Sequence, residues 1–142
     1  MSPSSRAAVA AALLLAAGCG GGQRLRYAEV TGVVTLDGKP LRGAVVTYHP
    51  VVDGPEGLPY SQGTTDETGR YALQTPEGKP GAVVGKCRAI VNWPMPERRD
   101  DKGPPPPPGP LIPIQYTVVM ETPLIVEVKE GGPQTIDLPL KR

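Results

Sequence analysis

One histidine and one late serine are the residues of this chain that could support nucleophilic catalysis. His49 is the only histidine, and Ser61 is the only serine after position 5. In a Ser-His-Asp arrangement the histidine removes the proton of the serine hydroxyl while a carboxylate orients the histidine. The sequence around Ser61 lacks the G-x-S-x-G turn that exposes such a serine in one large class of hydrolases. The pattern therefore argues against this chemistry and predicts that His49 is an exposed residue at a strand end.

Metal chemistry has few candidate ligands. Asp53, Glu56, Asp66 and Glu67 could bring carboxylates together for Ca²⁺ at one end of a domain, but the D-x-D-x-D-G spacing of a calcium loop is missing. Turn formation alone explains Asp66. A zinc centre needs three or four Cys, His or carboxylate ligands, and the single histidine makes such a centre improbable. We therefore expect no metal and no cofactor.

The two cysteines of the chain occupy different sequence environments. Cys19 follows the apolar residues 7–17 and precedes the glycines 20–22. Cys87 occupies an inward-facing position of a predicted strand, where a buried cysteine acts as a small hydrophobic residue; the alternative is a reactive or redox thiol. Because Cys19 lies on a glycine-rich segment, we expect no disulfide between the two, even in an exported protein.

The N-terminal region is typical of an export signal. A polar start with one positive charge precedes the apolar residues 7–17, which are too few to span a bilayer. Residues 16–18 (AAG) directly before Cys19 resemble the lipobox of bacterial lipoproteins, although Ala stands where that family usually has Leu. The resemblance implies cleavage after residues 1–18 and attachment of lipid to the Cys19 thiol. The alternative is an ordinary signal peptide in which Cys19 has no special role.

Residues 19–28 would then form a flexible tether, because glycine-rich segments behave as coils. The family's sorting habits, with no Asp at position 20, imply the outer membrane or cell surface of a double-membraned bacterium. The formal net charge of the whole chain is +1, and no basic patch indicates nucleic acid. The expected partners are the membrane, through the lipid anchor, and an envelope protein or polysaccharide.

Beyond the tether, apolar and polar residues alternate in short runs separated by turns. With 19 prolines and 18 glycines, long helices are not expected. Alternation predicts strands that are buried on one side. The seven predicted strands cover residues 30–36, 44–49, 62–66, 70–73, 83–91, 122–129 and 134–140. The predicted inward residues are Val30, Gly32, Val34, Leu36, Val46, Tyr48, Tyr71, Leu73, Cys87, Ala89, Val91, Leu124, Val126, Val128, Ile136, Leu138 and Leu140.

This strand pattern predicts an all-β fold: a seven-stranded antiparallel sandwich, Ig-like or transthyretin-like, over residues 29–142. Asp37 and Gly38 predict the first tight turn. Residues 94–115 form a proline-rich loop insert, in which the charged run 97–102 precedes consecutive prolines that favour a polyproline II rod. The insert is either a spacer or a docking ligand for an aromatic groove.

Four segments resemble one known family: VTGVVTLDGKPLRGAVVTYHP, TTDETGRYAL, GKCRAIV and TPLIVEVKEGGPQTIDLPL. They are similar to bacterial lipoproteins that carry a carboxypeptidase regulatory-like, transthyretin-like domain. The resemblance covers residues 29–140 apart from the insert, with Thr122 replacing the usual Ser. It implies an accessory or binding module, since the His-based centres of enzymes on related sandwiches lack their ligands here.

The sequence therefore predicts that the protein is not an enzyme. We expect a non-enzymatic, membrane-anchored lipoprotein of the cell envelope, lipidated at Cys19, that acts as an accessory protein-interaction or structural module. The alternative is an extracellular carbohydrate-binding module, in which Tyr60, Trp93 and Tyr116 would be exposed stacking platforms. The sequence does not indicate which ligand would be bound.

Overall fold

The computed structural model describes residues 25–52, 57–94, 103 and 109–142. Within these residues the regular structure is almost entirely strand, and one short 3₁₀ helix, η1 (Ile114–Tyr116), is the exception. The strands are β1 (Tyr27–Ala28), β2 (Val30–Leu36), β3 (Lys39–Pro40), β4 (Val45–Pro50), β5 (Ser61–Thr64), β6 (Arg70–Ala72), β7 (Ala82–Val83), β8 (Gly85–Asn92), β9 (Ile125–Val128), β10 (Gln134–Thr135) and β11 (Leu138–Leu140). The predicted all-β class is confirmed. No helix of the described residues is long and apolar enough to cross a membrane.

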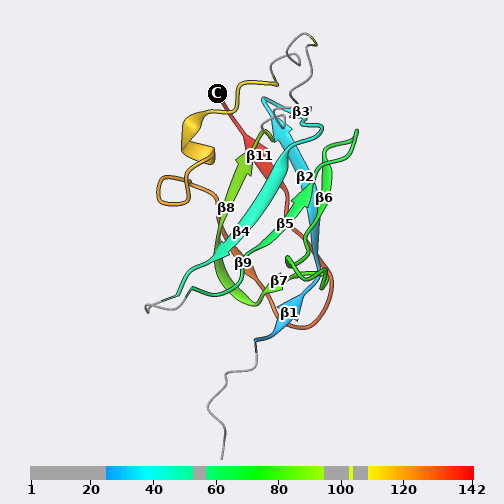
Figure 1. Cartoon of the computed structure of the whole chain (residues 1–142), viewed down its shortest axis with the longest axis vertical. Helices are drawn as coiled ribbons and strands as arrows, with labels where there is room; N and C mark the ends of the chain where they lie inside the picture. The colour runs from blue at the N-terminus through cyan, green and yellow to red at the C-terminus, as the bar shows by residue number, and fades with distance from the viewer. Residues whose placement is uncertain (1–24, 53–56, 95–102, 104–108) are drawn as a thin grey trace, which may run out of the picture.

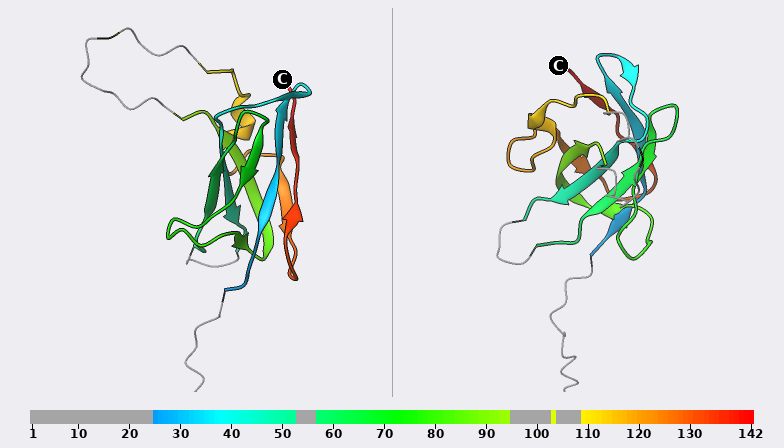
Figure 2. Two further views of the ribbon diagram at one scale, coloured as in Figure 1. Left: turned by 90° about the vertical axis from the view of Figure 1, so that its right-hand side faces the viewer. Right: turned by 45° about the horizontal axis from the view of Figure 1, so that its top comes forward.

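Two main sheets make up the fold. In the five-stranded sheet, β2 pairs with β3, β6, β10 and β11, and the four-stranded sheet has the order β5-β4-β8-β9. A small third sheet joins β1 to β7. Figure 1 places β1 at one end of the molecule and the end of β11 at the other, and the left view of Figure 2 shows β2 and β11 in one layer and β4 and β8 in the other. The arrangement is sandwich-like.

The core lies between these layers, as the period of two predicted. In β2, burial alternates strictly, so that Val30, Gly32, Val34 and Leu36 are buried. All the other predicted inward residues are buried except Leu124, Val126 and Ile136, which are partly buried and pack against the core. The alternation of side chains along a strand therefore located the core correctly.

The expectation that all strands pair antiparallel is wrong for the C-terminal segment. β10 and β11 pair parallel to β2, with Gln134 opposite Val30 and Leu138 opposite Val34. The reason is that β9 and β10 belong to different sheets. The turn at Gly131 and Gly132 therefore carries the chain across to the other layer instead of closing a hairpin within one sheet.

Strand bounds also differ from the predictions. Each predicted range contains a strand, but the last one is divided into β10 and β11 by Ile136 and Asp137, and the Asp137 carboxylate accepts a hydrogen bond from Val33 N at 2.9 Å. The two-residue strands β1, β3 and β7 were not predicted, because they are too short to show a period. β1 lies inside the segment assigned to the tether, so the folded part begins before residue 29.

A buried pair of tyrosines connects the two layers. The hydroxyls of Tyr48 in β4 and Tyr71 in β6 lie 2.8 Å apart, and the Tyr71 hydroxyl also donates to the Ile136 carbonyl. Tyr48 therefore donates to Tyr71. Burial raises the pKa of both hydroxyls above the ordinary tyrosine value. Both remain protonated at neutral pH, as this hydrogen-bond chain requires.

Most of the proline-rich insert lies outside the described residues, including the charged run 97–102 and the prolines 104–108, so its predicted role as spacer or docking ligand stays a prediction. Its described C-terminal part leads into η1, which lies against β8. Tyr116 at the end of η1 is buried and exchanges hydrogen bonds with the backbone of Lys141, at 3.2 and 3.3 Å.

Candidate functional site

The side chains of Ser61 and His49 lie on opposite faces of the sheet and do not form a common site. Ser61 stands opposite Tyr48 in the pairing of β5 with β4, and both side chains are buried in the core. His49 follows Tyr48 and faces the other side of the sheet, where its ring centroid lies 5.9 Å from that of Tyr60. Partial burial lowers the pKa of His49. A histidine on the far side of the sheet cannot deprotonate the serine, which excludes the triad.

The Ser61 hydroxyl has no hydrogen-bond partner among the residues that the structure describes. Because an unpaired buried hydroxyl is destabilising, Ser61→Ala is expected to leave the free energy of unfolding unchanged or to raise it by up to about 1 kcal/mol. Urea denaturation followed by circular dichroism measures this change. A loss of more than about 1 kcal/mol would show that the hydroxyl has a stabilising partner.

Thr65 provides the contrast to Ser61, because its buried hydroxyl donates to Leu41 O at 2.6 Å and accepts from Ala44 N at 2.9 Å. Thr65→Val, which keeps the shape of the side chain, is expected to cost about 1–3 kcal/mol. Equal effects of the two substitutions in the same urea experiment would contradict this assignment.

Of the four candidate Ca²⁺ ligands, the two that the structure describes are engaged elsewhere: Asp66 in the hydrogen bonds of a turn and Glu67 in an ion pair. The Asp66 carboxylate accepts hydrogen bonds from Thr68 Oγ1, Thr68 N and Arg70 N at 2.7–3.0 Å, and these hydrogen bonds, led by that from the Thr68 hydroxyl, hold its pKa below the ordinary value. Glu67 pairs with Arg42. Asp53 and Glu56 lie outside the described residues. Within the described ranges no group of three or more His, Cys, Asp or Glu side chains could hold a metal ion.

Of the two cysteines, only Cys87 lies within the described residues. Cys87 is a free, fully buried cysteine in β8, and burial raises the pKa of its thiol to about 11. It is thus a protonated core residue at neutral pH, as predicted, and not a reactive thiol. Cys19, the predicted lipid-attachment residue, lies outside the described residues.

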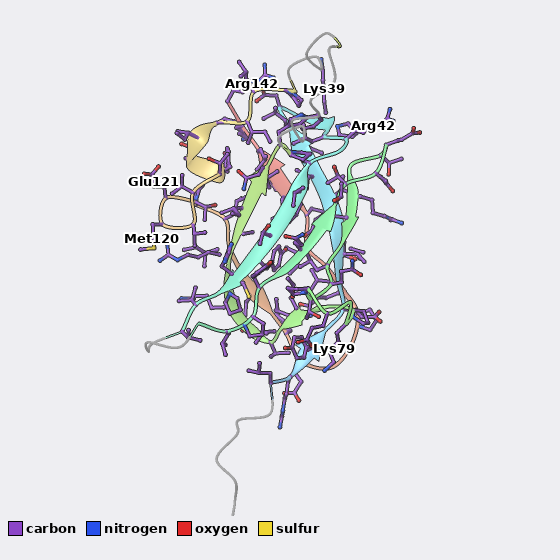
Figure 3. The ribbon with its side chains drawn as sticks, in the orientation of Figure 1. Lys39, Arg42, Lys79, Met120, Glu121 and Arg142 are labelled. Atoms are coloured by element: carbon purple, nitrogen blue, oxygen red, sulfur yellow. The ribbon has the colours of Figure 1, made fainter. Side chains whose placement is uncertain are left out.

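The structure contains a pocket that the sequence did not predict. It has a volume of about 530 Å³, within the ~300–1,000 Å³ typical of ligand pockets. It lies at the end of the fold opposite β1, where Figure 3 shows Lys39, Arg42 and Arg142 together. The lining residues are Leu36, Lys39, Pro40, Leu41, Arg42, Gly43, Trp93, Pro110 and Arg142.

A tight turn and the Thr65 hydroxyl fix the backbone on one side of the pocket. Asp37 and Gly38 both have positive φ, 52° and 82°, so the predicted turn joins β2 to β3 and places Lys39 opposite Leu36. The following segment carries Arg42, and Thr65 holds it at both ends through Leu41 and Ala44. The backbone of this wall is therefore fixed by hydrogen bonds.

Two glycines allow Trp93 to lie close to the backbone. A Cβ atom on Gly109 would lie 2.1 Å from Trp93 Nε1, and one on Gly43 would lie 3.4 Å from the far edge of the indole. The side chain nevertheless keeps 37% of its surface exposed. The indole of Trp93 is therefore packed closely against the backbone and still accessible as one wall of the pocket.

Two weak ion pairs flank the pocket. Arg42 pairs with Glu67 at 3.4 Å, and Arg142 pairs with Asp37 at 3.7 Å. All four side chains are at least 48% exposed, so each pair contributes little to stability and can be exchanged for a ligand. Lys39 makes no ion pair with any of the described residues.

The described lining residues offer hydrogen-bond donors and apolar surface to a ligand. The described side chains that line the pocket include no carboxylate, imidazole, hydroxyl or thiol that could act as a general base or nucleophile. Of the three predicted stacking aromatics, only Trp93 lines it. Tyr60 stacks beside His49 instead, and the expected exposure of Tyr116 is wrong because η1 packs this ring inward.

The pocket draws on residues from 36 to 142, and so no local motif signals it. Its single sequence signal is the lone tryptophan Trp93, which directly precedes the proline-rich insert. Comparison of the chain with protein-family models, curated proteins and solved structures finds no match.

Proposed function

We propose that this protein is a non-enzymatic lipoprotein of the cell envelope, held on the membrane through Cys19, whose folded domain contacts an envelope partner. The observation that carries the proposal is that β1 and the pocket lie at opposite ends of the fold. The chain enters at β1, and the pocket lies at the opposite end (Figure 1 and Figure 3). A lipid attached upstream of β1 would leave the pocket end directed away from the membrane.

The proposal includes a family assignment. We infer a carboxypeptidase regulatory-like, transthyretin-like domain, supported by the order of the four resembling segments and by a two-sheet arrangement with a tight turn at Asp37 and Gly38. The proposed location is the outer membrane or the cell surface, supported by the absence of Asp after Cys19. A pocket lined by apolar and cationic side chains supports a binding role.

Metabolic labelling with a palmitate analogue tests the anchor. The wild type is expected to incorporate label, and Cys19→Ser is expected to lose it. Cys87→Ala is the matched control, since it removes the chain's second cysteine without touching the proposed anchor. Label that persists in Cys19→Ser, or wild type that takes up none, would refute the anchor.

A carbohydrate-binding module is the second candidate, and one observation favours it: Trp93 presents an accessible indole in a pocket. Sugar rings stack on such faces. The candidate predicts that a glycan array detects binding by the wild type and none by Trp93→Ala. It is the weaker of the two because Tyr60 and Tyr116 do not join Trp93.

A further inference from the structure

The described side chains that line the pocket can donate hydrogen bonds but cannot accept them. Lysine, arginine and the indole nitrogen are donors only. The remaining lining side chains are those of Leu, Pro and Gly, which have no polar atoms. A ligand that fits this set has groups that accept and do not donate, and ionised carboxylates meet that requirement.

The charges of the pocket indicate the same ligand chemistry. Lys39, Arg42 and Arg142 lie together at this end (Figure 3), whereas no acidic side chain is among the described lining residues. Two of the three cations have only exposed ion pairs, which a ligand carboxylate can replace. The pocket is thus complementary to an anion.

The apolar walls of the pocket favour a ligand that carries an apolar group beside its carboxylates. Leu36, Pro40, Leu41 and Pro110 line the pocket together with the indole of Trp93. A neutral sugar fits these walls poorly, because each of its hydroxyls has a proton to donate and none of the described lining side chains can accept it. A peptide can combine an apolar side chain with flanking carboxylates.

We propose that this pocket binds an acidic peptide segment of a partner protein, in which an apolar side chain packs on Trp93 and neighbouring Asp or Glu residues pair with Lys39, Arg42 and Arg142. This rests on the proposed function as an interaction module and specifies the partner's chemistry. The apolar group and the ion pairs both contribute to affinity, and the charges also set the orientation of the peptide.

Fluorescence of Trp93 measures the binding directly, because it is the only tryptophan of the chain. The detergent-solubilised full chain is titrated with a capped peptide in which one leucine is flanked by Asp and Glu. Matched peptides replace the acids with Asn and Gln, or the leucine with glycine. An oligogalacturonate supplies the same charge on sugar rings.

The acidic leucine peptide is expected to shift Trp93 emission saturably, and added salt is expected to weaken it. The Asn/Gln peptide is expected to bind about tenfold more weakly or worse, since its ion pairs with the pocket cations are lost. Equal binding of those two peptides, or no shift with either, overturns the proposal. Tighter binding of the oligogalacturonate also overturns it and assigns the pocket to acidic sugars.

Substitutions of the pocket cations test whether the acidic peptide binds at this pocket. The combined change Lys39→Gln, Arg42→Gln and Arg142→Gln is expected to weaken the acidic peptide about tenfold or more. Lys79→Gln, at the opposite end of the fold (Figure 3), is the matched control and is expected to bind as the wild type does. Unchanged binding by the triple variant would refute the proposed pairing.

Trp93→Ala is measured by anisotropy of a labelled acidic peptide, and circular dichroism verifies its fold. Wild-type affinity in this variant would exclude the indole as the binding wall. The peptide series on the wild type remains decisive if a variant fails to fold. None of these titrations depends on lipid at Cys19, so failure of the anchor and failure of the pocket give different results.

Discussion

Gly32→Ala is expected to lower the free energy of unfolding by at least about 3 kcal/mol, the upper end of what overpacking costs. A Cβ atom at this position would lie 1.8 Å from the Ile136 carbonyl oxygen and 2.9 Å from Tyr71 Cε1. The backbone of Ile136 cannot yield easily, because its N–H donates to Thr31 at 2.7 Å and its carbonyl accepts the Tyr71 hydroxyl. The methyl group would separate β2 from the C-terminal segment.

Gly57→Ala is the matched control, because a Cβ there would have no neighbour within 4 Å among the described residues. It is expected to change the free energy of unfolding by no more than about 0.5 kcal/mol. Urea denaturation followed by circular dichroism compares the two variants. Similar midpoints for Gly32→Ala and the wild type would mean that β2 and Ile136 are not in contact.

Leu138→Ala is expected to cost about 2–5 kcal/mol, because the side chain is 1% exposed and its removal leaves a cavity between the layers. Val126→Ala is expected to cost only about 1 kcal/mol, since Val126 lies in β9 and is only partly buried. The sequence pattern alone assigns these two positions the same inward role, and the structure separates them.

Thermal and urea denaturation of the two variants measure this difference. The comparison tests the register of β11 on β2, because Leu138 reaches the core only when it stands opposite Val34. A smaller loss for Leu138→Ala than for Val126→Ala would require β11 to be displaced by one residue, which turns every side chain to the other face.

Alternation predicted the core because it depends on local geometry. In β2 the inward residues follow from the period of two and from nothing else in the chain. The turn at Asp37 and Gly38 was also predictable, since both residues tolerate the positive φ that the turn requires. These features require only residues that are neighbours in sequence.

The features that escaped prediction depend on distant contacts. The parallel pairing of β10 and β11 follows from which sheet they join, and alternation does not contain that information. Tyr116 looked like an exposed loop aromatic, but η1 lies against β8 and turns the ring inward. The pocket was unpredictable for the same reason: Lys39, Trp93 and Arg142 meet only in the folded chain.

The parallel pairing of β2 with the C-terminal segment has a kinetic consequence. Val33 and Asp137 are joined by a hydrogen bond although 104 positions separate them. Contacts between such distant residues slow folding, because a long loop must close before the contact forms. The layer around β2 can therefore be completed only after the ribosome has released almost the entire polypeptide. Until then the edge of β2 that pairs with β10 and β11 remains open.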